Sequence, residues 1–143
     1  MISYGRQSID DDDLEAIIDV FKSDWLTQGP TVERFESSLC QYFGSNYACA
    51  VSNGTAALHL AGLALGWGPS DIILTTPITF LASVNCIRYV NAKPVFCDSN
   101  LITGQIDLND LIKKISKKTR AIIVPHLYGN VLNIDKLLKI KRK

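Results

Sequence analysis

Hydrophobic positions have helical spacing over the first 46 residues of the chain. In residues 12–22 apolar side chains recur three and four positions apart, which is typical of an amphipathic helix. Those side chains are Leu14, Ile17, Ile18 and Phe21. A second helix is predicted from Pro30, because proline is favoured in a first helical turn. Its buried side chains would be Val32, Phe35, Leu39 and Phe43. Residues 1–46 are therefore interpreted as a helical segment, with a turn-rich connector and an exposed Trp25 at 25–30.

From residue 47 onward, short apolar runs alternate with helical stretches. The predicted strands are 47–51, 72–75, 94–97 and 121–124, and the predicted helices are 55–65, 80–90, 108–115 and 134–143. Strands without polar alternation, separated by helices, indicate a mostly parallel sheet covered by helices on both faces. Residues 47–143 are therefore predicted to form an α/β domain, with no sign of closure at its C-terminal end.

The charge balance argues against a polyanion-binding protein. The 143 residues are 47% hydrophobic and 20% charged with a net charge of +1, which is ordinary for a soluble globular chain. Nine of the 14 acidic residues lie within 1–36, and ten of the 15 basic residues lie within 113–143. A basic tail can bind a polyanion, but solvated helix faces are the commoner meaning. We expect no nucleic-acid partner.

Cysteine usage and apolar runs indicate a cytoplasmic protein. The four cysteines, Cys40, Cys49, Cys86 and Cys97, lack metal-ligand spacing and fall in apolar stretches, as buried thiols do in a reducing cytosol. The longest apolar stretch, 48–67, is interrupted by polar residues and is a poor membrane span. No basic segment followed by an apolar one opens the chain, so secretion is not expected. We therefore predict no metal site and no membrane partner.

Polar segments follow each predicted strand, where a parallel α/β sheet binds its ligands. These segments are 52–55, 76–80, Asp98 and 126–129. The segment 52–57 opens a helix, whose free amides and dipole favour a phosphate. Gly54 would let the backbone come close and Thr55 would add a hydroxyl donor, although Ser52 could simply cap the helix.

Three further residues at this edge have two interpretations each. Phe80 could lie flat against a planar ring or be an ordinary core side chain. Asp98 could bind a ligand or cap the following turn. His126 could move protons or contact a ring, and it could equally be a structural histidine bonded to the backbone.

Together these segments resemble the DegT/DnrJ/EryC1/StrS family of sugar aminotransferases, which have the fold-type-I architecture of pyridoxal-phosphate enzymes. Seven segments match in the family's order: GRQ at 5–7, LTQGP at 26–30, FE at 35–36, SNGTAALHL at 52–60, TPITF at 76–80, AKPVFCD at 92–98 and KTRAIIVPH at 118–126. Within the family, residues 2–10 and 74–80 most resemble the transaminases of pseudaminic acid biosynthesis. Those enzymes transfer an amino group from glutamate to C4 of a UDP-linked 4-keto-6-deoxy-N-acetylhexosamine.

The resemblance implies a cofactor, site residues and a partner. It implies that Thr55 and Ala56 hold the phosphate of pyridoxal 5'-phosphate, that Phe80 stacks on its ring, and that Gly54 is permissive in the same turn. Residues 4–7 and 25–30 would lie near the pocket for the nucleotide-sugar substrate. The complete enzyme would be a homodimer in which a second subunit completes the site.

The resemblance also implies that no catalytic residue lies within this sequence. Transamination needs a Schiff-base lysine and a carboxylate that keeps the pyridinium protonated, and in the family both come later in the chain. Lys93, Lys117 and Lys118 precede strands and belong to the opposite edge of the sheet. The chain alone is therefore predicted to be inactive, marginally stable and poorly soluble, because half a sheet leaves edges and apolar faces unpaired.

Other functions stay open from the sequence. A non-catalytic remnant could keep cofactor or partner binding without chemistry. A sugar 3-dehydratase of the same family carries histidine in place of the lysine, and the residues present do not separate it from a transaminase. A dinucleotide-binding fold is disfavoured because the first strand–helix turn lacks G-x-G-x-x-G.

Overall fold

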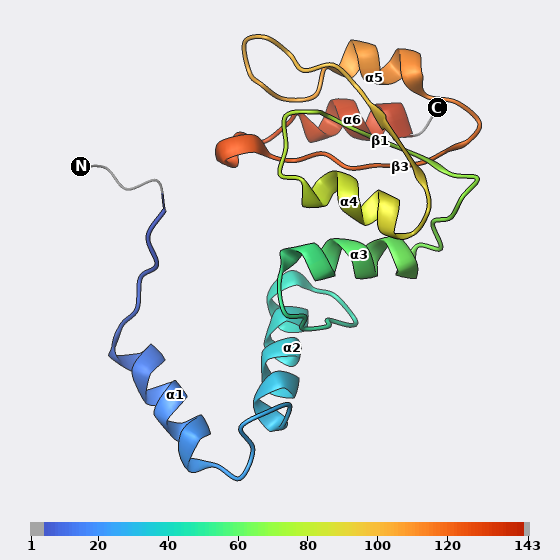
Figure 1. Ribbon diagram of the computed structural model, residues 1–143. Helices are drawn as coiled ribbons and strands as arrows, with labels where there is room; N and C mark the ends of the chain where they lie inside the picture. The colour runs from blue at the N-terminus through green and yellow to red at the C-terminus, as the bar shows by residue number, and fades with distance from the viewer. Residues whose placement is uncertain (1–4, 142–143) are drawn as a thin grey trace. The chain divides into compact units, whose positions relative to one another are not determined.

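The computed structural model (Figure 1) describes residues 5–141 and divides the chain into two compact units, one up to Ala50 and the other from Val51 onward. Residues 1–4 and 142–143 lie outside the described residues, and so do parts of the predicted helix 134–143 and of the segments 2–10 and 4–7.

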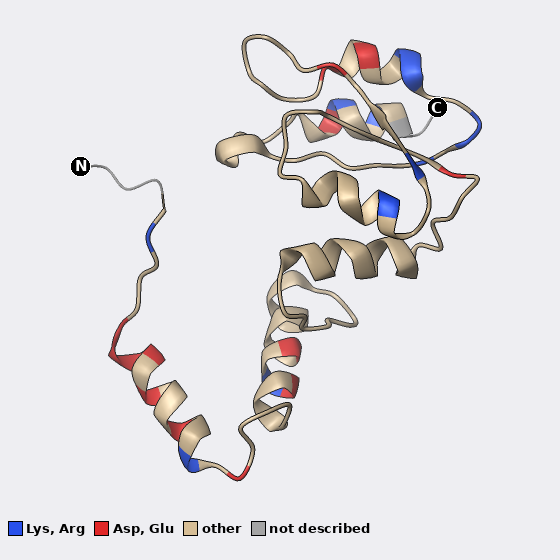
Figure 2. Cartoon of the chain, viewed as in Figure 1, with Lys and Arg blue, Asp and Glu red and all other residues tan. Residues whose placement is uncertain are grey.

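The first unit contains the two predicted helices, α1 (Asp11–Lys22) and α2 (Pro30–Phe43). A capping box starts α1: the Asp13 amide donates to the Asp10 carboxylate at 3.2 Å, and the Asp10 amide donates to the Asp13 carboxylate at 3.1 Å. Three aspartates, Asp11–Asp13, occupy the first turn of the helix, where the helix dipole favours them, and further acidic residues follow along it (Figure 2). Pro30 opens α2 and Gly44 ends it in a left-handed conformation. The sequence therefore located both helices.

The burial predicted for these helices is wrong. Neither helix has a buried residue; Phe21 is 71% exposed and Phe43 is 71% exposed. The other predicted core positions are also exposed, apart from the half-buried Leu39: they are Leu14, Ile17, Ile18, Val32 and Phe35. An amphipathic pattern fixes which face of a helix is apolar, but burial needs a second surface, and the described part of the first unit supplies none over these faces.

The predicted strand 47–51 is also wrong. The segment is irregular and pairs with no strand of the described chain, and Tyr47 is 91% exposed. The amide of Ala50 donates instead to the Glu36 carboxylate at 2.7 Å. An apolar run becomes a strand only where a neighbouring edge can accept its backbone hydrogen bonds.

A three-stranded parallel sheet forms the centre of the second unit. Strand β1 (Ile72–Thr75) lies between β2 (Lys93–Phe96) and β3 (Thr119–Ile122). Ile72 is paired with Lys93 on one side and Thr119 on the other, and an irregularity follows in the β1–β3 pairing. The first predicted strand has the observed bounds, whereas β2 begins one residue and β3 two residues earlier than expected.

Helices cover both faces of this sheet, as predicted. The chain order after Val51 is α3 (Gly54–Ala64), β1, α4 (Ala82–Tyr89), β2, α5 (Leu108–Lys114), β3, the 3-10 turn η1 (Leu127–Gly129) and α6 (Ile134–Lys141). Ile73 packs with α3 and α4 residues, whereas its neighbour Leu74 packs with α5 and α6 residues on the other face. The strands accordingly lie between the two helix pairs (Figure 1).

The cysteines differ in burial. Cys86 and Cys97 are fully buried, and burial raises the pKa of both thiols. Cys40 is half-buried, whereas Cys49 is exposed, so its predicted burial is wrong. Cys49 lies in the irregular segment that lacks a partner strand. All four are free thiols.

Two adjacent buried threonines at the end of β1 give opposite predictions. Thr75 and Thr76 are both fully buried. The Thr75 hydroxyl has no hydrogen-bond partner among residues 5–141, whereas the Thr76 hydroxyl is bonded to the Ser99 hydroxyl at 2.8 Å. Thr75→Val should raise the free energy of unfolding by about 1 kcal/mol, because it removes an unsatisfied buried oxygen. Thr76→Val, the matched control, should lower the free energy of unfolding by about 1 kcal/mol, because it leaves the Ser99 hydroxyl without its hydrogen-bond partner. Urea denaturation of the variants measures both, and destabilisation by Thr75→Val would contradict the assignment.

Candidate functional site

The carboxyl ends of the three strands and the start of α3 lie on one side of the second unit (Figure 1). The loop after β1 and the loop after β2 are joined there by the Thr76–Ser99 hydroxyl bond. The sequence-predicted segments 52–55, 76–80, Asp98 and 126–129 therefore belong to one edge of a single unit. This is the edge at which parallel α/β sheets bind ligands.

At the start of α3, backbone donors remain available. Asn53 is the N-cap, and its side-chain oxygen accepts from the Ala56 amide at 2.9 Å, so the suggested Ser52 cap is not the one used. Ser52 instead accepts from the Asn53 side-chain amide at 3.2 Å. The amides of Gly54 and Thr55 and the Thr55 hydroxyl make no hydrogen bond within the described part of the chain. A Cβ on Gly54 would meet nothing within 4 Å, so the space beside this residue is open.

Phe80 is available to a planar ligand. It lies in the turn between β1 and α4 and is 76% exposed, so its interpretation as an ordinary core side chain is wrong. The same turn is fixed from within by the hydroxyls of Thr79 and Ser83, which are 2.9 Å apart. An exposed aromatic ring on a held turn can stack on a flat group at little further entropic cost.

Two hydrogen bonds fix the backbone of Asp98 to helix α5 and its N-cap. The Asp98 amide donates to the Asp110 carboxylate at 2.7 Å, and the Asp98 carbonyl oxygen accepts from the Asp107 amide at 2.7 Å. Lys114 forms an ion pair with Asp110 at 2.7 Å and donates to the Phe96 carbonyl oxygen at 2.9 Å. The hydrogen bond from Lys114 and that from the Asp98 amide lower the pKa of Asp110, and Asp110 in turn raises the pKa of Lys114. Helix α5 is thereby fastened to the end of β2, while the Asp98 side chain stays exposed.

His126 is hydrogen-bonded to the backbone, as expected for a structural histidine, which was one of the two roles predicted for it. Its Nδ1 accepts from the Leu132 amide at 3.4 Å, and the residue is exposed. It directly precedes η1, in which Tyr128 has a left-handed backbone with φ of 53°. Hydrogen bonding at Nδ1 leaves Nε2 as the ring atom that can contact a ligand.

The three lysines named from the sequence lie where expected. Lys93 begins β2, and Lys117 and Lys118 directly precede β3, so all three are at the amino ends of strands. Lys113 and Lys114 end α5. Within residues 5–141 there is no cluster of three metal-ligating side chains, and no helix is long and apolar enough to cross a membrane.

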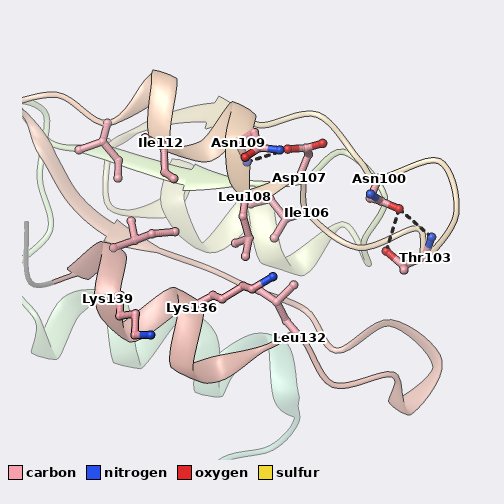
Figure 3. A pocket seen from close by; sticks show the side chains of 12 residues that line it. Asn100, Thr103, Ile106, Asp107, Leu108, Asn109, Ile112, Leu132, Lys136 and Lys139 are labelled. Carbon is pink, nitrogen blue, oxygen red and sulfur yellow. Dashed lines mark hydrogen bonds between the residues drawn. The ribbon is translucent and has the colours of Figure 1, made fainter.

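A groove of about 680 Å³ lies between α5 and α6 (Figure 3). Ile112 and Leu108 on one side face the helix that carries Lys136 and Lys139 on the other. Neither the start of α3 nor Phe80 contributes to its lining. Sequence reasoning missed this groove, because its walls come from helices separated by a strand and a long turn.

Comparison with known proteins identifies the class of this fold. The PMP form of a putative sugar aminotransferase from Streptococcus pneumoniae, Spr1654, matches with a TM-score of 0.90 and 30% identity over 98% of this chain and 35% of that chain. A GDP-4-keto-6-deoxymannose-3-dehydratase with a trapped PLP-glutamate geminal diamine matches with a TM-score of 0.87 and 28% identity over 94% of this chain and 36% of that chain. The architecture is thus part of the large domain of a PLP-dependent, fold-type-I transferase.

Sequence comparison then gives the family. The pattern of the DegT/DnrJ/EryC1/StrS aminotransferase family matches residues 7–143, and the chain belongs to that family. GDP-perosamine synthase from Escherichia coli O157:H7 is 37% identical over 90% of this chain and 35% of its own length. UDP-4-amino-4,6-dideoxy-N-acetyl-beta-L-altrosamine transaminase from Campylobacter jejuni is 38% identical over 100% of this chain and 38% of its own length. The chain therefore spans about a third of the length of these relatives, whose sugars differ.

Proposed function

We propose that the chain supplies the phosphate- and ring-binding part of the cofactor site of a PLP-dependent nucleotide-sugar aminotransferase. Thr55 and the amides at the start of α3 would hold the phosphate of pyridoxal 5'-phosphate, and Phe80 would stack on its ring. The observation that carries the proposal is the set of unused donors at Gly54 and Thr55, on the sheet edge that also presents Phe80.

The residues present fit a phosphate group. An anion at the start of α3 would meet two unpaired amides, a hydroxyl and the positive end of the helix dipole. The open space beside Gly54 admits it. The Ala56 amide fits only after a rearrangement, because the Asn53 side chain already accepts from it. Ala56 would therefore bind the phosphate only if Asn53 turned away.

The chain would bind the cofactor without completing its chemistry. Pyridoxal phosphate, when bound, supplies an electron sink for bond cleavage next to a substrate nitrogen. The residues of this chain would hold and orient it. The lysine and the pyridinium carboxylate that transamination also requires are assigned to no position among the 143 residues, so we propose that this chain by itself does not transaminate.

The substrate proposal is a UDP-linked 4-keto-6-deoxy-N-acetylhexosamine, with glutamate as the amino donor. The Campylobacter jejuni relative supports it, since its name describes a dideoxy N-acetyl amino sugar linked to UDP. The comparably similar GDP-perosamine synthase supports a broader class of nucleotide sugars. A homodimer in the cytoplasm, in which the partner subunit completes the site, is part of the same proposal.

A titration with pyridoxal 5'-phosphate tests the cofactor site. We expect saturable quenching of tryptophan fluorescence and weaker binding of pyridoxal, which lacks the phosphate. Borohydride reduction should label the exposed lysines in a scattered way and no single lysine stoichiometrically. The phosphate should matter most, because charge-assisted hydrogen bonds are the stronger ones. Equal affinity for both ligands would contradict a phosphate site at α3, and a cofactor fixed to one lysine would contradict the absence of a Schiff-base lysine.

A second function is supported by one comparison. The solved dehydratase is about as similar in fold as the aminotransferase, so a sugar 3-dehydratase shares this part of the structure. In the family the two activities differ in whether lysine or histidine occupies the Schiff-base position. Reading the encoding DNA beyond codon 143 in all three frames would separate them, and a stop codon without either residue would favour a non-catalytic remnant.

A further inference from the structure

A single buried side chain joins two loops at the carboxyl edge of the sheet. Gln105, in the loop after β2, is 7% exposed, and its Nε2 donates to the backbone carbonyl oxygen of Asn130. Asn130 directly follows η1, in the segment after β3. Burying a side-chain amide is costly unless it is hydrogen-bonded, so this contact fixes the two loops to each other.

The loop that carries Gln105 is held at its base. Ser99 and Ile106 form an antiparallel bridge, and the Asn100 amide donates to the Gln105 carbonyl oxygen at 2.8 Å. The Ser99 hydroxyl is bonded to Thr76 at the end of β1. The side chain of Gln105 is thus presented from a closed, anchored loop.

This loop lies directly against η1. Gly104 has φ of +69°, and a Cβ there would come within 3.3 Å of Leu127 Cδ2. In η1, Tyr128 has the left-handed conformation that costs an aromatic residue energy. The Asn130 amide donates to the Leu127 carbonyl oxygen at 2.9 Å, while the Asn130 carbonyl oxygen receives Gln105. Gln105 therefore supports a turn whose backbone is unfavourable by itself.

The segment that follows this turn forms a hydrogen bond with the His126 ring. Its Nδ1 accepts from the Leu132 amide at 3.4 Å, an arrangement that favours the Nε2–H tautomer of the neutral ring. His126 and Leu132 lie on either side of Asn130, the residue that Gln105 holds. Loss of the Gln105 contact would free the segment that brings the two atoms together.

We propose that Gln105 is a positioning residue, which clamps Asn130 and thereby keeps His126 in a single tautomer with its Nε2–H available to a ligand at the carboxyl edge. The ligand part of this proposal rests on the proposed function, which places the cofactor at the same edge of the sheet.

Histidine-labelled protein at pH 8 tests the clamp by long-range proton–nitrogen NMR, which distinguishes the tautomers. The chain has two histidines, and His59 serves as an internal reference, because it contacts Tyr89 and takes no part in the clamp. The wild type should show mainly the Nε2–H tautomer at His126. Gln105→Met, which keeps the length but loses the donor, should show a mixture at His126 and no change at His59.

Two further variants complete the test. Asn100→Ala removes the side-chain oxygen that accepts from the Ile102 and Thr103 amides at 3.0 and 3.1 Å in the same loop, but it leaves the clamp, so His126 should resemble the wild type. Gln105→Glu, a carboxylate without a donor at pH 8, replaces Gln105→Met if the latter does not fold. A single Nε2–H tautomer in either folded Gln105 variant would overturn the proposal, and so would a mixture in the wild type.

The NMR is carried out without cofactor, so the two proposals can fail separately. A single wild-type tautomer, lost in the Gln105 variants, together with no saturable cofactor binding would reject the cofactor site and leave the clamp. Cofactor binding with a mixed tautomer in the wild type would reject the clamp alone.

Discussion

Leu74→Ala should lower the free energy of unfolding by about 3 kcal/mol, the largest effect expected from any single substitution considered. Leu74 is fully buried in the central strand and packs with residues of α5 and α6. The truncation removes apolar contacts and leaves a cavity that the flanking strands cannot close. Because single domains have only about 5–15 kcal/mol of stability, the variant should be largely unfolded under conditions that the wild type tolerates.

Leu101→Ala is the matched control for this substitution. Leu101 is fully exposed at 101%, so the same change of residue should alter the free energy of unfolding by less than about 0.5 kcal/mol. Urea denaturation followed by circular dichroism measures both variants. Equal destabilisation by the two substitutions would show that Leu74 is not part of a packed core.

Thr55→Ala should weaken binding of pyridoxal 5'-phosphate roughly 30-fold, the fold-change for about 2 kcal/mol lost with one hydrogen bond to a charged group. Thr55 is half-buried in the first turn of α3, and its hydroxyl makes no hydrogen bond within residues 5–141. Alanine suits a helix at least as well as threonine, so stability should not fall. Fluorescence titration with the cofactor measures the change in Kd.

Thr31→Ala controls for the substitution itself. Thr31 is the second residue of α2, as Thr55 is the second residue of α3, and its hydroxyl accepts from Arg34 at 3.1 Å. The cofactor affinity of this variant should equal that of the wild type. Unchanged affinity in Thr55→Ala would exclude its hydroxyl as a phosphate ligand.

The sequence predicted the elements of the fold better than their packing. Helices α1 and α2 were located from apolar spacing and from Pro30 in a first helical turn, which are local properties. The exposure of their apolar faces and the missing strand at 47–51 depend on surfaces elsewhere in space. The bounds predicted for β3 were two residues too late for a similar reason. Its pairing with β1 is irregular, and the hydrophobic run from Ala121 to Val124 does not indicate that irregularity.

The candidate site was only partly accessible to sequence reasoning. The start of α3 could be predicted, because a strand followed by a glycine-containing helix start has a known geometry. That Asn53 would cap the Ala56 amide was missed, although asparagine is a favoured cap. Gln105 gave no signal: a glutamine in a loop is usually exposed, and only the contact with Asn130, distant in sequence, buries it.

The central position of β1 gives the second unit an order of assembly during synthesis. Its pairing with β2 spans only α4, whereas its pairing with β3 must also enclose α5 and the loop before it. Closing a shorter loop costs less entropy, and the nearer partner leaves the ribosome first. The parallel β1–α4–β2 crossover can thus form while β3 is still being made, which leaves one edge of β1 open to nascent neighbours until β3 has emerged.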